Sequence, residues 1–245
     1  MQLIVNGLLI NYEIINPSGK RTILILHGWG RNFTEWVPFA KLLPIDYRIL
    51  LMDLPGFGNS SLPGNPKFSL LDYVKVVEEF LSKKSIKNIC LLGHSFGGKI
   101  AIVFASKSKI ISKLFLISPS GISKPGIEVR ATAYLAKTIK RMIRFFILLP
   151  NKSIKIFGSA DYKKAGPLTD IFKNIVSTNV SNYATKINNK TIIIWGENDR
   201  EIPLSSANIL TELISDSLIR IVWDAGHDPH LEQPEKLLGI IKDYI

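Results

Sequence analysis

The chain has 245 residues, 46% of them hydrophobic, and a formal net charge of +11 at pH 7. This length and apolar content fit one globular domain with room for an insertion. No stretch approaches the roughly 18–20 consecutive apolar residues of a membrane span, and the first residues lack the basic and small-residue pattern of a secretory signal peptide. The single cysteine, Cys90, excludes an internal disulfide and favours a reducing compartment. We therefore expect a cytoplasmic protein that is not integral to a membrane.

The first 120 residues alternate between short apolar runs and helical periodicity. A strand pair is predicted over 5–15, turning at Asn6 and Gly7, because Asn-Gly suits a tight hairpin. Further strands are predicted over 22–26, 47–52, 88–92 and 114–117. Helices are predicted over 34–43, 69–81 and 98–106, the second with Ser69 as its N-cap.

The alternation stops between residues 121 and 187, where helical stretches occur without a clear strand. It resumes with strands over 191–195 and 218–223 and helices over 204–213 and 234–244. This pattern predicts a parallel-rich sheet covered on both faces. The interruption predicts a helical insertion above the carboxyl edge of the sheet, where ligands bind in such folds. We therefore expect a core domain of residues 1–120 and 188–245 and a helical lid of residues 121–187.

The most informative motif is the corner between a strand and a helix at Gly93, Ser95, Gly97 and Gly98. A turn this sharp crowds side chains against the backbone, so small residues are needed beside the serine. The turn lifts the Ser95 hydroxyl out of the sheet and places it near a helix N-terminus. A hydroxyl in that place suits a nucleophile, provided that a base and an orienting acid accompany it.

The sequence resembles the α/β-hydrolase family in five motifs that follow one another in the family order. They are His27-Gly-Trp-Gly30, Asp53-Leu-Pro-Gly-Phe-Gly58, Gly93-His-Ser-Phe-Gly97, Trp195-Gly-Glu-Asn-Asp199 with Pro203, and Gly226-His227 with Glu232-Gln-Pro234. The resemblance implies an α/β fold with a mostly parallel eight-stranded sheet flanked by helices and a helical lid inserted after strand six. Serine at the corner argues against the dehalogenase and epoxide-hydrolase branches, which use an aspartate there.

The resemblance also implies a catalytic triad of Ser95, Asp199 and His227. Ser95 is the nucleophile, His227 the general base that takes its proton, and Asp199 the acid that fixes the imidazole. The weighed alternatives are His230 as the base, and Glu197, Glu201 or Asp224 as the acid, each of the three otherwise a solvated loop carboxylate.

Two backbone N–H groups, those of Trp29 and Phe96, are expected to form the oxyanion hole, and the Trp29 side chain is expected to line the substrate pocket. His27 and His94 are expected to support loops by hydrogen bonding, and Asp53 to brace the loop after its strand. The spacing of the four histidines and Cys90 predicts no metal site, and no glycine pattern predicts a nucleotide, so no cofactor is expected.

The predicted lid carries most of the basic charge of the chain. It contains twelve Lys and Arg but three Asp and Glu, a net +9. Within 128–149 the basic residues Arg130, Lys137, Arg141 and Arg144 share one helical face, and the apolar residues Leu135, Ile139, Met142 and Phe146 lie opposite. We expect the apolar side to face the substrate. The basic side is either simply solvated or a surface for an acidic acyl carrier protein, an anionic membrane or an anionic substrate; nucleic acid fits less well.

These features predict a serine hydrolase that cleaves a small-molecule ester with a hydrophobic acyl part, as a monomer or dimer. The run His27-Gly-Trp-Gly30 with Asn32 and Trp36 resembles the pimeloyl-acyl-carrier methyl esterases. Three alternatives remain: a carbon–carbon bond hydrolase acting on ring-cleavage diketones, a lipase or lysophospholipase, and a non-catalytic ligand-binding member of the fold.

Overall fold

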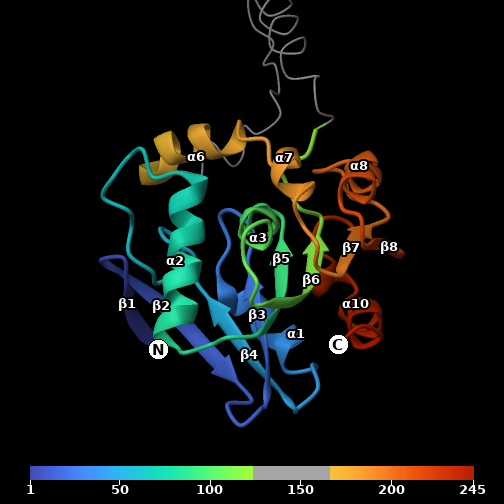
Figure 1. Ribbon diagram of the computed structural model, residues 1–245, viewed down its shortest axis with the longest axis horizontal. Coiled ribbons are helices and arrows are strands. Elements are labelled where there is room, and N and C mark those ends of the chain that lie inside the picture. The colour runs from blue at the N-terminus through green and yellow to red at the C-terminus, as the bar shows by residue number, and fades with distance from the viewer. Residues whose placement is uncertain (124–165) are drawn as a thin grey trace, which may run out of the picture.

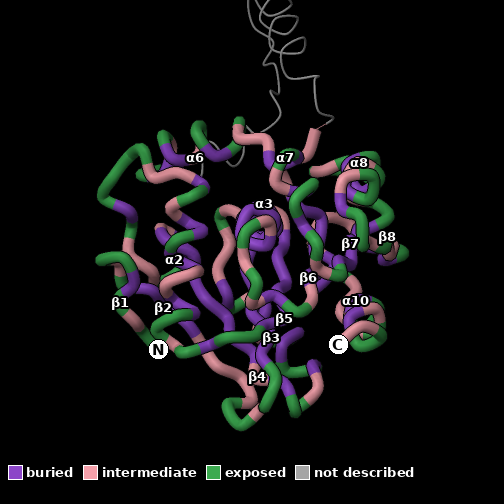
Figure 2. The backbone as a smooth tube through the Cα atoms, in the orientation of Figure 1, coloured by how far each residue is buried: buried purple, intermediate pink, exposed green. Residues whose placement is uncertain are grey.

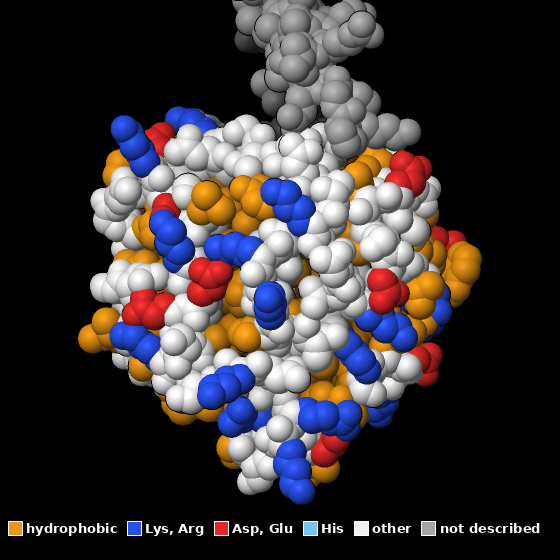
Figure 3. All heavy atoms as spheres, in the orientation of Figure 1, with side chains coloured by type: hydrophobic (Ala, Val, Ile, Leu, Met, Phe, Trp, Pro, Cys, Tyr) orange, Lys and Arg blue, Asp and Glu red, His pale blue; other side chains and the backbone are white. Residues whose placement is uncertain are grey.

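The computed structural model describes residues 1–123 and 166–245. The four apolar residues expected to line the pocket from the lid, Leu135, Ile139, Met142 and Phe146, lie outside the described residues, as do most of the lid's basic residues. Across the described part, opposite charges are interspersed on the face shown in Figure 3. No helix in these two ranges has both the length and the apolar character needed to cross a membrane.

The described strands form one sheet in the order β1-β2-β4-β3-β5-β6-β7-β8. The strands β1 and β2 pair antiparallel, as do β2 and β4, and the others run parallel. Their bounds are β1 Gln2–Val5, β2 Leu8–Ile15, β3 Arg21–Leu26, β4 Tyr47–Met52, β5 Ile89–His94, β6 Ile111–Ile117, β7 Thr191–Gly196 and β8 Ser217–Val222. The predicted α/β-hydrolase fold, with its mostly parallel eight-stranded sheet, is confirmed.

Helices cover both faces of the sheet (Figure 1). One core packs the helices α2 Leu70–Lys83, α3 Phe96–Ala105 and α8 Ser205–Leu213 against alternate strand residues such as Leu24 and Leu50. The other core packs α10 Pro234–Lys242 and the 33–40 region against the intervening strand residues, such as Ile23 and Ile49, which point to the opposite face of the sheet. Because neighbouring strand residues point to opposite faces, the apolar runs serve both cores and the strands are buried at the centre of Figure 2.

Several element boundaries differ from the prediction. The first strand begins at Gln2, and the hairpin turns with positive φ at Asn6 and Gly7. The predicted helix 34–43 is a 3₁₀ turn, η1 Phe33–Trp36, followed by the one-turn helix α1 Val37–Ala40, whose first turn contains Pro38. A short helix, α9 Pro229–Glu232, was not predicted, because a single turn carries no periodic signal.

The described end of the insertion is helical. It contains η2 Gly166–Leu168, α6 Thr169–Val176 and α7 Ser181–Ala184. The ring of Phe172 in α6 lies 5.0 Å from that of Trp29, centroid to centroid, so α6 covers the loop that follows β3. The domain division at residues 121 and 187 stays a prediction.

Candidate active site

Ser95 occupies the corner between β5 and α3 in a strained backbone conformation, with φ 50° and ψ −110°. Such a conformation costs on the order of 1–3 kcal/mol in a non-glycine residue and persists only where the surroundings enforce it. Gly97 shows the crowding, because a Cβ there would lie 2.2 Å from the carbonyl oxygen of Leu26. The corner predicted from the glycine spacing is therefore present.

Asp199 and His227 come from the loops after β7 and β8 and meet at 2.9 Å, between Oδ2 and Nδ1. Their side chains are 1% and 9% exposed. Burial acts to lower the pKa of His227, but the Asp199 hydrogen bond and charge outweigh it and raise that pKa above its ordinary value. Burial likewise acts to raise the pKa of Asp199, and the bond from His227 helps to hold that pKa below its ordinary value.

The second carboxylate oxygen of Asp199 is held by the backbone. Its Oδ1 accepts hydrogen bonds from the N–H groups of Glu201 at 2.9 Å and Ile202 at 3.0 Å. The orientation of the carboxylate is thus fixed from both sides, and Oδ2 is directed at the imidazole.

Ser95 and His227 both line a cavity of about 640 Å³. The structure gives no hydrogen bond between these two described residues. Hydrogen bonds at such sites are often long before substrate binds, so their common cavity is the relevant observation. The imidazole thus meets the carboxylate on one side and the serine's cavity on the other.

The loop with Trp29 lies beside the serine corner, to which Gly97 N–H ties it by donating to the carbonyl of His27 at 3.1 Å. No acceptor within the described residues is found for the backbone N–H of Trp29 or Phe96. The Trp29 ring contacts those of Phe57 and Phe96 at centroid distances of 4.8 and 5.2 Å. Trp29 is also among the residues that line the cavity.

Three residues expected to support loops do so. His94 Nε2 donates to the carbonyl oxygen of His227 at 2.8 Å, and His27 Nε2 accepts a backbone N–H from just beyond β4 at 3.0 Å. The Asp53 carboxylate accepts two backbone N–H groups and the side-chain amide of Asn11. Burial is the main cause that lowers the pKa of His94 well below its ordinary value, so this ring is neutral at pH 7.

The alternative site residues lie elsewhere, with one exception. His230 is buried and stacks on Trp36, with parallel rings 3.7 Å apart. The Asp224 carboxylate accepts a bond from Lys236 at the surface. Glu201, interpreted as a solvated loop acid, is exposed but also lines the cavity, with Oε2 3.7 Å from His227 Nε2. Its position two residues after Asp199 in the same loop was the available signal.

Comparisons with known proteins bear on the fold and on the family of the chain. Residues 21–138 match the family model described as "alpha/beta hydrolase fold". Monoacylglycerol lipase ABHD6 of Mus musculus is 27% identical, over 94% of this chain and 76% of that protein. The 2-hydroxy-6-oxononadienedioate/2-hydroxy-6-oxononatrienedioate hydrolase of Klebsiella pneumoniae is 26% identical, over 93% of this chain and 88% of its own.

The solved structures carry the same fold. An esterase from Exiguobacterium antarcticum superposes with a TM-score of 0.76 at 22% identity, covering all of this chain and 98% of the esterase. At that identity the similarity of the structures shows the fold alone. The chain therefore has the α/β-hydrolase fold, and the family model together with the relatives supports a hydrolase of the α/β-hydrolase family.

Proposed function

We propose that this hydrolase cleaves carboxylic esters through an acyl-enzyme formed on Ser95. The observation that carries the proposal is the buried Asp199–His227 pair, whose imidazole lines the same cavity as a serine held in a strained corner. A carboxylate, an imidazole and a hydroxyl arranged in this order are the parts that convert a neutral serine into a nucleophile.

In the first step the Ser95 oxygen attacks the ester carbonyl carbon, and its proton passes to His227 Nε2. The negative charge that develops on the carbonyl oxygen is stabilised by the N–H groups of Trp29 and Phe96, for which the described part of the chain offers no acceptor. When the carbon–oxygen bond breaks, His227 gives the proton to the departing alcohol. A water molecule, deprotonated by His227, then attacks the acyl carbon. The bond from that carbon to the Ser95 oxygen breaks, His227 returns the proton to that oxygen, and the acid leaves.

The substrate's acyl part is hydrophobic in this proposal. The described wall of the cavity near Ser95 includes the aromatic side chains of Trp29 and Phe57 and the aliphatic Leu168. Burial of apolar surface against such a wall favours an acyl chain by roughly 0.8 kcal/mol per CH₂ group. A panel of p-nitrophenyl esters from acetate to long chain, beside an acyl-carrier-linked methyl ester, tests both the chain length and the carrier.

Labelling with a fluorophosphonate tests the nucleophile directly. Wild-type protein is expected to be labelled and Ser95→Ala to be neither labelled nor active, with an unchanged circular dichroism spectrum. Ser82→Ala is the matched control, because Ser82 is an exposed serine on α2. Near-full activity in Ser95→Ala would refute the proposal.

A second candidate is hydrolysis of a carbon–carbon bond in a dienol-type diketone, which the similarity to the Klebsiella hydrolase favours. The same three residues would serve, so the two functions differ in substrate. Turnover of such a diketone can be measured as the loss of its visible absorbance. A diketone rate that exceeds every ester rate would make this second function the main one.

A further inference from the structure

A group of unpaired polar atoms lies buried behind His227. Eight buried side-chain nitrogen and oxygen atoms in the described residues lack a hydrogen-bond partner, and six of them belong to this one group. They are carried by Glu35, Trp36, His94, Asp228 and His230. A buried polar atom without a partner costs about 1–3 kcal/mol, so a ligand that pairs several of these atoms at once would be favoured here.

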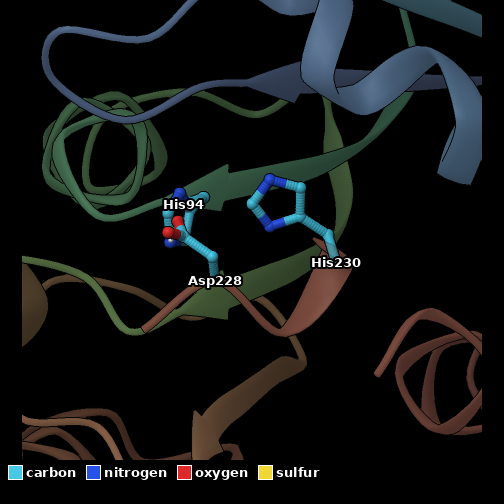
Figure 4. Close-up of side chains that lie close together, drawn as sticks. All are labelled: His94, Asp228 and His230. Atoms are coloured by element: carbon cyan, nitrogen blue, oxygen red, sulfur yellow. Dashed lines mark ion pairs between the residues drawn. The ribbon is translucent and has the colours of Figure 1, made fainter. Parts of the chain in front are cut away.

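Three of these residues face one another (Figure 4). His94 ends β5, Asp228 follows the His227 loop, and His230 lies in α9. One ligand atom from each lies within 4.8 Å of the other two, and His94 Nε2 is 3.7 Å from Asp228 Oδ1. His94 and His230 are 1% and 3% exposed, and neither nitrogen of His230 has a partner.

Two imidazole nitrogens and one carboxylate oxygen are a donor set that suits Zn²⁺ and similar transition metals better than Mg²⁺ or Ca²⁺. Tetrahedral Zn²⁺ with bonds of about 2.0–2.1 Å holds its ligand atoms about 3.4 Å apart. His94 Nε2 and Asp228 Oδ1, 3.7 Å apart, are already near that separation. Because no two of the three ligand atoms are more than 4.8 Å apart, no pair needs to approach by more than about 1.4 Å. Asp228 can supply this movement, because its side chain is 17% exposed whereas His230 is stacked on Trp36.

The charge around the three residues also favours a cation. Asp228 Oδ2 is paired with Arg31 at 2.5 Å, which leaves Oδ1 without a partner. Glu35 Oε1, also unpartnered, lies 3.6 Å from His230 Nε2. The two carboxylates, of Asp228 and Glu35, carry more negative charge than the single guanidinium of Arg31 can neutralise. Access is provided by the substrate cavity, which His94 and Asp228 both line.

We propose that His94, Asp228 and His230 bind a divalent transition-metal cation, and that this cation inhibits hydrolysis. Coordination by His94 Nε2 requires the proton of that nitrogen to move to the unpartnered Nδ1, since the neutral imidazole must offer the metal a free lone pair and keeps one ring proton. The same proton makes the hydrogen bond to the His227 carbonyl. The metal therefore removes a bond that holds the loop of the proposed base.

Calorimetric titration of chelator-treated protein with ZnCl₂ at pH 7.5 tests the site without relying on turnover. Wild-type protein is expected to bind one Zn²⁺. His230→Phe keeps a ring against Trp36 but removes both nitrogens, and it is expected to weaken Zn²⁺ binding at least 100-fold. Losing a residue that only hydrogen-bonds to a metal ligand typically weakens binding by about 10–100-fold. His227→Ala keeps the backbone carbonyl and is expected to bind within a few-fold of wild type.

Each other outcome overturns the site. No binding to wild-type protein refutes it, and so does binding that His227→Ala abolishes and His230→Phe retains, which would place the metal at the Asp199–His227 pair. Should His230→Phe fail to give a native circular dichroism spectrum, Asp228→Asn is the second variant, with the same expected loss. Zn²⁺ bound without slowing wild-type ester turnover would refute the inhibition, and a lack of any turnover would challenge the proposed function but not the titration.

Discussion

Replacing Asp199 by asparagine exchanges one carboxylate oxygen for an NH₂ group. We expect this change to move the imidazole proton of His227 from Nδ1 to Nε2. The Oδ1 position of Asp199 accepts two backbone N–H groups, at 2.9 and 3.0 Å. The amide oxygen of asparagine must take that position, because an NH₂ group there would face two donors. Its NH₂ group then points at His227 Nδ1, which can only accept it. The imidazole proton moves to Nε2, and Nε2 can no longer take the proton of Ser95.

The size of the loss follows from this tautomer. The equivalent change in a serine protease triad lowers kcat by about 10⁴-fold, which corresponds to about 5 kcal/mol of transition-state stabilisation. We expect a loss of similar size in p-nitrophenyl butyrate turnover. Since the asparagine keeps the shape of the aspartate, the thermal midpoint is expected to change little.

The pH profile gives an independent readout. His227 acts as a base when neutral, and its pKa is raised in the folded protein, with the Asp199 bond the main raising cause. Wild-type kcat/KM is therefore expected to rise with pH through a midpoint above the ordinary histidine value of about 6.5. In Asp199→Asn the His227 pKa, followed by ¹⁵N NMR, is expected to fall, and the neutral ring is expected to carry its proton on Nε2.

Asp224→Asn is the matched control, because Asp224 is an exposed acid in the loop of His227 and pairs with Lys236. It is expected to leave kcat unchanged. Retention of kcat within about tenfold of wild type in Asp199→Asn, with a native thermal midpoint, would refute the reasoning. Equal losses in both variants would do the same.

Three further substitutions test other parts of the structure. In chelator-treated buffer, His230→Ala is expected to reduce ester turnover far less than His227→Ala, and the reverse ranking would show that His230 is the base. Gly97→Ala is expected to lower the free energy of unfolding by about 1–3 kcal/mol and to reduce turnover, because its Cβ would meet a backbone carbonyl oxygen at 2.2 Å; wild-type values in chemical denaturation and in the ester assay would contradict this. Burial lowers the pKa of Lys99 to about 8, so the unfolded chain binds more protons than the folded one between about pH 8 and 10.5, and stability gains from this group as pH rises. Lys99→Met is expected to lack that gain, which the difference in unfolding free energy between the two proteins at pH 7.5 and 9.5 measures.

Local signals in the sequence were enough for most of the fold. The strand over 47–52 was predicted with its observed bounds, and the helix that follows Ser69 begins where predicted, because apolar runs and an N-cap are encoded within a few residues. The region 34–43 was predicted as one helix and forms two short turns. Its apolar spacing is helical, but Asn32 caps Thr34 in a 3₁₀ turn and Pro38 starts a new one.

The candidate site likewise has residues that the sequence could predict and residues that it could not. Ser95, Asp199 and His227 each follow a strand, so motif order and sheet topology were sufficient to predict that they lie near one another. The group around His94 and His230 could not be predicted from ligand spacing, since 136 positions separate the two histidines in the sequence. Only the pairing of β5 into the sheet and the return of the chain after β8 bring them together.

The neighbours of Ser95 connect the parts that its proposed chemistry needs. His94, one residue before it, holds the His227 loop through a carbonyl, and Gly97, two residues after it, holds the Trp29 loop through the carbonyl of His27. Both bonds end on backbone oxygens, so they fix where each loop lies without occupying the side chains or N–H groups that face the cavity. A shift of the serine corner must therefore carry the proposed base and the proposed oxyanion donors with it. This coupling gives a physical reason for a strained, glycine-lined corner, because the positions of the His227 loop and of the Trp29 loop are both set relative to Ser95.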